Sequence, residues 1–151
     1  MALFKLIHIL AVIIWVGGMF FAYMVLRPSL PGLLKQQERL RLWDKVFNRF
    51  FKWVWLAVLL LLASGLYMIY EMGGMGHVPR FVHLMLLLGI VMVLIFTYIF
   101  LGCYSRFNLL VEAKDWPNAD ALLATMRKLI AVNLVIGLLT VCVAVIGRGM
   151  L

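Results

Sequence analysis

The chain has 151 residues, of which 66% are hydrophobic and 13% charged, and its formal net charge is +8. Its mean hydropathy of +1.09 excludes an ordinary soluble domain, so we predict one all-α integral membrane domain over residues 1–151. The basic side chains lie between the apolar stretches, where they set membrane topology, and we therefore expect no nucleic-acid partner.

Four stretches are long enough to cross a bilayer, which takes roughly 20 apolar residues per helix. They lie at about residues 3–26, 50–70, 81–103 and 129–146. The first is too long and too aromatic for a cleaved signal peptide, so we keep it as a membrane helix. The sequence therefore predicts an antiparallel four-helix transmembrane bundle in contact with lipid.

The connections between these stretches differ in charge. The third connection is basic, the second contains only Arg80, and the first contains a run of cations: Arg27, Lys35, Arg39, Arg41, Lys45, Arg49 and Lys52. Because basic loops stay in the cytoplasm, both chain termini are expected to be periplasmic, in a bacterial inner membrane. Amphipathic helices are expected to lead from both basic connections into the second and fourth spans.

The first span carries His8 about one and a half turns, roughly 8 Å, below the outer surface. Its face continues with small residues and one aromatic side chain: Ala11, Trp15, Gly18 and Ala22. Lys5 lies one turn above His8 on the same face. This stripe would suit a flat cofactor or, equally, close packing of helices.

The second span places Ser64 and Gly65 near the level of His8. It is followed by "EMGGMGHVP", a short glycine-rich sequence that predicts a tight outer turn. The turn and the start of the next span contain Met72, Met75, His77 and Met85. Thioether and imidazole donors suit Cu(I), so these residues form an alternative copper site.

The third span begins with Arg80 and His83, and His83 descends from the outer surface to a depth similar to that of His8. Two imidazoles at one level can ligate one haem iron from opposite sides, and a four-helix bundle can hold a b-type haem. We therefore predict His8 and His83 as axial ligands, with Trp15, Gly18 and Gly65 around the porphyrin. Arg80, Lys5 and Arg148, at the outer end of the fourth span, are the candidates to pair with its propionates.

Two cysteines remain, Cys103 at the inner end of the third span and Cys142 in the outer part of the fourth. Their depths differ too much for a disulfide bond, and neither belongs to a C-x-x-C pattern. We interpret both as packing residues.

Two segments also resemble a known family. "LIHILAVIIWVGGMFFAYMVLRP" (residues 6–28) and "MRKLIAVNLVIGLLTV" (residues 126–141) resemble the first and last segments of CopD-like (copper-resistance D) membrane proteins. That resemblance implies a link to copper or haem handling. The chain is also similar in layout to HemJ-type protoporphyrinogen oxidases, whose early histidine matches His8. Their His-x-Lys pattern is met here as "HLM", with Met85 in place of the lysine.

The first hypothesis is therefore a bis-histidine haem b protein that acts in electron transfer or haem handling, with a quinone or periplasmic redox partner. Copper binding or import is the second hypothesis, and a porphyrinogen-related or haem-related oxidase is the third. Whether the chain is an oxidoreductase, and whether it forms a homodimer, stays open.

Overall fold

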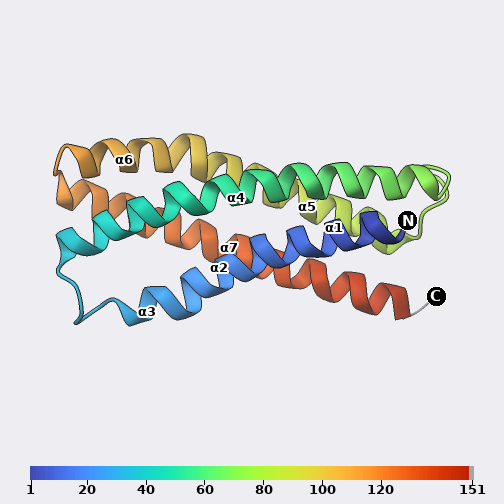
Figure 1. Ribbon diagram of the computed structural model, residues 1–151, viewed down its shortest axis with the longest axis horizontal. Coiled ribbons are helices and arrows are strands. Elements are labelled where there is room, and N and C mark those ends of the chain that lie inside the picture. The colour runs from blue at the N-terminus through green and yellow to red at the C-terminus, as the bar shows by residue number, and fades with distance from the viewer. Residues whose placement is uncertain (150–151) are drawn as a thin grey trace.

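The computed structural model describes residues 1–149, and it is helical throughout (Figure 1). The first helical rod alternates α-helix with π-helical segments, labelled η: α1 (Ala2–Val12), η1 (Ile13–Gly17), α2 (Gly18–Phe20), η2 (Phe21–Leu26) and α3 (Arg27–Ser29). The second is one helix, α4 (Gln36–Glu71). The third comprises α5 (Arg80–Tyr98), η3 (Ile99–Tyr104) and α6 (Ser105–Glu112), and the fourth is α7 (Trp116–Gly149).

These rods confirm the predicted transmembrane bundle. All four are long and apolar enough to cross a membrane: Ala2–Ser29, Gln36–Glu71, Arg80–Glu112 and Trp116–Gly149. The helices before the second and fourth spans are continuous with them, as predicted from the amphipathic connections. The second, third and fourth rods are each longer than the roughly 20 residues that a bilayer requires, so parts of them extend beyond the hydrocarbon.

The bundle has two chemically different ends. Ala2, Gly149 and the turn at residues 72–79 lie at one end, which we call the terminal end (Figure 1). The opposite end, which we call the basic end, holds the connections at residues 30–35 and 113–115. Most of the Lys and Arg residues gather there, as the sequence predicted for the first and third connections.

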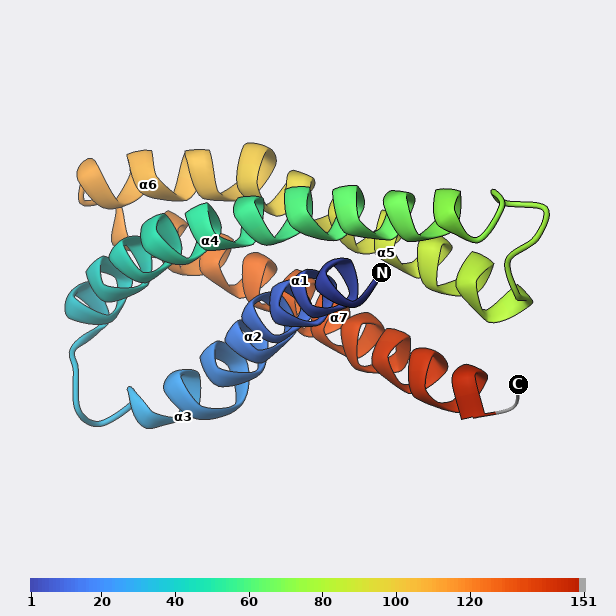
Figure 2. The ribbon, with the colours of Figure 1, turned by 45° about the vertical axis from the view of Figure 1, so that its right-hand side comes forward.

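Helix pairing is not uniform along the bundle. At the terminal end α1 packs along α4, and α5 packs along α7. The middle of the first rod, from η1 to η2, crosses α7 (Figure 2). The first and third spans therefore belong to different helix pairs at the terminal end, which bears directly on the predicted haem site.

An aromatic cluster joins the rods in the middle of the bundle and toward the basic end. Phe51 of α4 lies 5.5 Å from Phe96 and 5.2 Å from Tyr104, between ring centroids, and Trp55 lies 5.1 Å from Phe96. These are edge-to-face contacts, the favourable geometry for aromatic rings. Such packing matters because the hydrophobic effect does not drive membrane helices together.

The two cysteines differ in environment. Cys103 is buried against the cluster, as expected of a packing residue, whereas Cys142 is exposed on α7. The interpretation of Cys142 as a buried packing residue is therefore wrong. The face of α7 that carries Cys142 turns away from the other rods. Its depth in the membrane could be estimated from the sequence, but not whether its side chain points toward the bundle or away from it.

Candidate metal site

The first predicted ligand, His8, is half-buried and faces α4. Its Nδ1 lies 2.9 Å from Ser64 Oγ, and the Ser64 hydroxyl donates to the carbonyl of Leu60 one turn earlier. Because that hydroxyl has one proton and donates it to the backbone, its oxygen accepts a hydrogen bond from the His8 Nδ1–H. The Nε2 of His8 therefore keeps its lone pair, which is the form that a metal ion requires.

The small residues near His8 serve helix packing. A Cβ added at Gly65 would lie 3.4 Å from His8 Cε1, so glycine lets the imidazole approach the α4 backbone. A Cβ at Gly18 would overlap the ring of Phe50. Trp15 is buried and lies edge-on to Phe96, 6.0 Å between ring centroids. Of the two interpretations of this stripe, the packing one accounts for these contacts.

The second predicted ligand, His83, is exposed on α5. Its Nδ1–H donates to the carbonyl of Pro79, 3.3 Å away, in the preceding turn of chain. The structure thus joins His8 to Ser64 and places His83 on the other helix pair, so it does not itself bring the two imidazoles together. The three predicted propionate partners, Arg80, Lys5 and Arg148, are all exposed at the terminal end.

The turn at residues 72–79 depends on two consecutive glycines with positive φ, Gly73 at +94° and Gly74 at +87°. These left-handed conformations are open to glycine and strained for other residues. The Gly74 N–H donates to the carbonyl of Ile69 at 2.9 Å, and the His77 N–H donates to the Gly74 carbonyl at 3.1 Å. Val78 is buried and anchors the turn on the helices beside it.

The imidazole ring of His77 forms a hydrogen bond to the backbone of this turn, which orients the side chain. Its Nδ1–H donates to the Gly73 carbonyl at 2.9 Å, so in the neutral ring the lone pair is on Nε2, and the imidazole is exposed. A backbone carbonyl on the second ring nitrogen is the usual support of a metal-binding histidine, because it fixes the tautomer and the orientation. Sequence reasoning missed this role of Gly73; its only signal was the Gly-Gly pair before the histidine.

The predicted sulfur donors lie in the same turn and in the first part of α5. Met72 is 37% exposed and Met75 43% exposed, so both thioethers are accessible from outside, and Met85 is half-buried on α5. Within residues 1–149, no cluster of three or more His, Cys, Asp or Glu side chains can hold a metal ion. The side chains available at this turn are methionine thioethers and the His77 imidazole, donor types that suit Cu(I).

Acidic side chains near the turn are already engaged. Glu71 accepts a hydrogen bond from the Tyr67 hydroxyl at 2.7 Å, and its other oxygen lies 3.7 Å from the amino group of Met1. Phe4 stacks on Tyr67 with 3.8 Å between ring centroids. This contact fixes the start of α1 beside the end of α4, so the donors of the turn extend from a firmly packed helix pair.

Comparison with known proteins now adds to this geometry. The family model described as CopD, copper resistance protein D, matches residues 44–146, which is well over half of the chain. No curated protein and no solved structure gives a significant match. The matched region contains the turn at residues 72–79 and most of three of the four rods. The chain belongs to the CopD (copper resistance protein D) family of membrane proteins.

Proposed function

We propose that this chain is a copper-handling membrane protein that captures Cu(I) at the turn of the terminal end, with Met72, Met75 and His77 as donors. Membership of the copper resistance protein D family supports the metal. The observation that carries the proposal is the fixed tautomer of His77, whose Nδ1–H is held by the Gly73 carbonyl at 2.9 Å. Copper is the cargo in this proposal, and Met85 is a further donor one helix away.

The charge distribution supports an outward-facing site. All Lys and Arg residues except Lys5, Arg80 and Arg148 lie in the half of the bundle that includes the basic end. Because cationic loops remain in the cytoplasm, the terminal end faces the periplasm of a bacterial inner membrane. The turn would then meet copper arriving from outside the cell, and the exposure of its two methionines suits that role.

Copper titration of the purified protein tests this function. We expect the wild-type protein in detergent to compete with a chromophoric chelator for one Cu(I), and a Met72→Leu/Met75→Leu/His77→Gln variant to lose that binding. Met24→Leu is the matched control, because Met24 is also exposed but lies on η2 toward the basic end. If the triple variant still binds Cu(I) as the wild type does, the turn is not the copper site.

A second candidate, the b-type haem, rests on His8. A half-buried imidazole inside a membrane span is costly and therefore suggests a function, and its Nε2 lone pair is available for iron. A bound haem would supply one-electron redox chemistry, as electron transfer to a quinone or periplasmic partner requires. The fit of the residues is incomplete, because His83 is exposed on a helix that packs with α7. Ligation by both histidines would need α5 to approach α1, or a second copy of the chain.

Spectroscopy separates the two candidates. A haem protein would show a Soret band and, after dithionite, split α and β bands that His8→Leu abolishes. The copper proposal expects neither band and expects His8→Leu to leave Cu(I) binding unchanged. Complementation of a protoporphyrinogen-oxidase deficiency tests the related oxidase, in which Met85 replaces the lysine of the HemJ-type pattern.

A further inference from the structure

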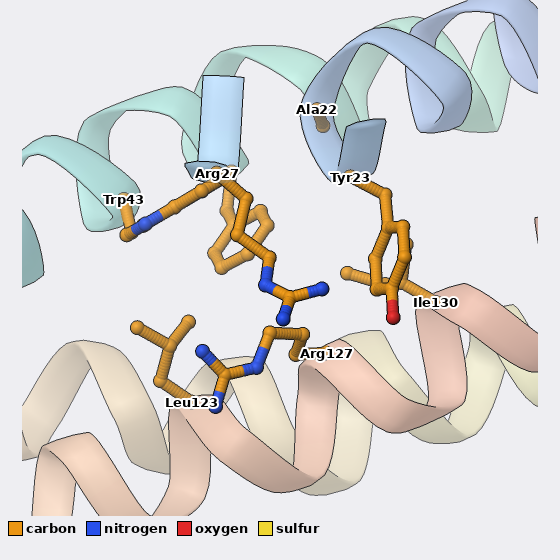
Figure 3. Close-up of a pocket in the computed structure, with 8 residues that line it drawn as sticks. Ala22, Tyr23, Arg27, Trp43, Leu123, Arg127 and Ile130 are labelled. Atoms are coloured by element: carbon orange, nitrogen blue, oxygen red, sulfur yellow. The ribbon is translucent and has the colours of Figure 1, made fainter. Parts of the chain in front are cut away.

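A small pocket at the basic end lies between η2, α4 and α7 (Figure 3). Its cavity measures about 30 Å³, and together with the solvent-filled mouth the hollow measures about 330 Å³. Its polar lining comes from Arg27, Arg127 and Tyr23, whereas Ala22, Leu123 and Ile130 are buried apolar side chains that form its walls. Arg27 and Arg127 extend toward one another across this space from different rods, with the Tyr23 hydroxyl beside them (Figure 3).

The two guanidinium groups meet without an acidic partner. Within residues 1–149, neither Arg27 nor Arg127 forms an ion pair with a carboxylate. Asp44, on the neighbouring α4, is engaged elsewhere: both of its carboxylate oxygens accept hydrogen bonds from Asn108 Nδ2, at 3.0 and 3.2 Å. Arg27 is half-buried, and its guanidinium lies over the Tyr23 ring, 4.6 Å from the centroid, which holds the group in the pocket.

Arg127 is exposed at the mouth of the pocket and Arg27 is half-buried, so the two like charges converge at an apolar wall, where they repel each other more strongly than in bulk water. An anion between them removes this repulsion. Guanidinium groups bind the oxygens of phosphate in paired hydrogen bonds, for which two arginines from different helices provide the donors. We propose that Arg27 and Arg127 form a binding site for one phosphate group, with the Tyr23 hydroxyl as a third donor.

The phosphate can come from an anionic phospholipid headgroup or from a soluble phosphate. Both sources offer the same oxygens to the arginines. A lipid would also place its acyl chains along the apolar rods, since Arg27 directly follows the predicted first span and Arg127 lies just before the predicted fourth span. This site lies at the opposite end from the proposed copper turn and does not depend on it.

Binding measurements on the full-length protein test the site. Native mass spectrometry would compare retention of phosphatidylglycerol with that of phosphatidylcholine, and thermal unfolding would be followed with added inorganic phosphate. We expect phosphatidylglycerol to stay bound to the wild type and to be held about tenfold more weakly after Arg27→Gln or Arg127→Gln, because hydrogen bonds between charged groups are lost. Lys128→Gln is the matched control, since it removes one positive charge beside Arg127 without touching the pocket.

Each outcome has a defined meaning. Retention of phosphatidylglycerol that depends on both arginines but not on Lys128 supports a lipid phosphate. Stabilisation by inorganic phosphate alone, with the same dependence, supports the site with a soluble source. Equal retention and equal stabilisation in the wild type, the arginine variants and the control would overturn the proposal. Arg127→Lys keeps the charge but loses the fork of donors, so it covers the case in which the glutamine variants fail to fold, and weaker binding is expected for it too.

Discussion

Replacement of Gly73 by alanine should weaken copper binding without touching a ligand. Gly73 has a φ of +94°, and its carbonyl accepts the hydrogen bond that orients His77. An alanine with such a positive φ costs about 1–3 kcal/mol in backbone strain. Its Cβ would also lie 3.3 Å from His77 Cγ and 3.4 Å from Nδ1, closer than ordinary contact, so the ring must move by a few tenths of an ångström.

The expected size of the effect follows from the role of that hydrogen bond. Loss of the group that orients a ligating histidine typically reduces metal affinity about 10-fold to 100-fold. We therefore expect the dissociation constant for Cu(I), measured by chelator competition in detergent, to rise by about this factor in Gly73→Ala. Thermal unfolding of the same samples would show that the variant remains folded.

Two nearby glycines provide matched controls. Gly74 also has a positive φ, of +87°, but a Cβ there meets nothing within 4 Å, so Gly74→Ala introduces backbone strain without crowding the ring. Gly76 has neither feature, and Gly76→Ala should bind copper like the wild type. If Gly73→Ala and Gly76→Ala bind copper equally well, the orientation of His77 by the Gly73 carbonyl has no role in binding.

Three further substitutions test the packing that supports the sites, each by thermal unfolding in detergent. Gly18→Ala should destabilise the protein by about 1–3 kcal/mol because its Cβ would overlap the ring of Phe50, whereas Gly17→Ala, with open space around its Cβ, should not. Ser64→Ala removes the hydroxyl that accepts the hydrogen bond from His8, and should lower the free energy of unfolding by about 0.6–1.7 kcal/mol. An unchanged stability would mean that this hydrogen bond contributes nothing. Asn133→Leu removes a long hydrogen bond, from Asn133 Nδ2 to the Met92 carbonyl at 3.4 Å, together with a buried Oδ1 that has no partner within residues 1–149. Because the unpaired oxygen costs more than the long bond contributes, we expect a gain in stability of roughly 1 kcal/mol, and a loss of stability would show that the bond to Met92 is needed.

The architecture was predictable because the bilayer restricts it so strongly. The thickness of the hydrocarbon fixes the length of each span. Backbone N–H and C=O groups must be paired within the protein in lipid, which excludes open sheets and irregular segments as spans. Counting residues from the surface also predicted that Ser64 and Gly65 lie at the level of His8, and the structure confirms both neighbours. Depth along the membrane normal is thus readable from sequence, since every helical residue advances by a fixed rise.

Position around the helix axis was harder to predict. His83 shares the predicted entry side with His8, yet its rod pairs with α7 while α1 pairs with α4. Which helices become neighbours depends on side-chain fit, including the aromatic contacts of Phe51 and Phe96, and not on any single periodicity. For the same reason the sequence did not predict that Arg27 approaches Arg127. Within its own connection, each arginine is one of several basic residues that set membrane topology.

The separation of the two proposed sites makes them electrostatically independent. The pocket touches α4 at Trp43 and Phe47, and the turn begins at Met72, so at the rise of an α-helix the two sites are roughly 38 Å apart along α4. Charges interact over a Debye length of only about 8 Å at physiological ionic strength. Removing a guanidinium at the basic end should therefore leave Cu(I) affinity at the turn unchanged. In the proposed copper-handling role this arrangement would also be favourable, because most of the positive charge lies away from the turn that would capture Cu(I).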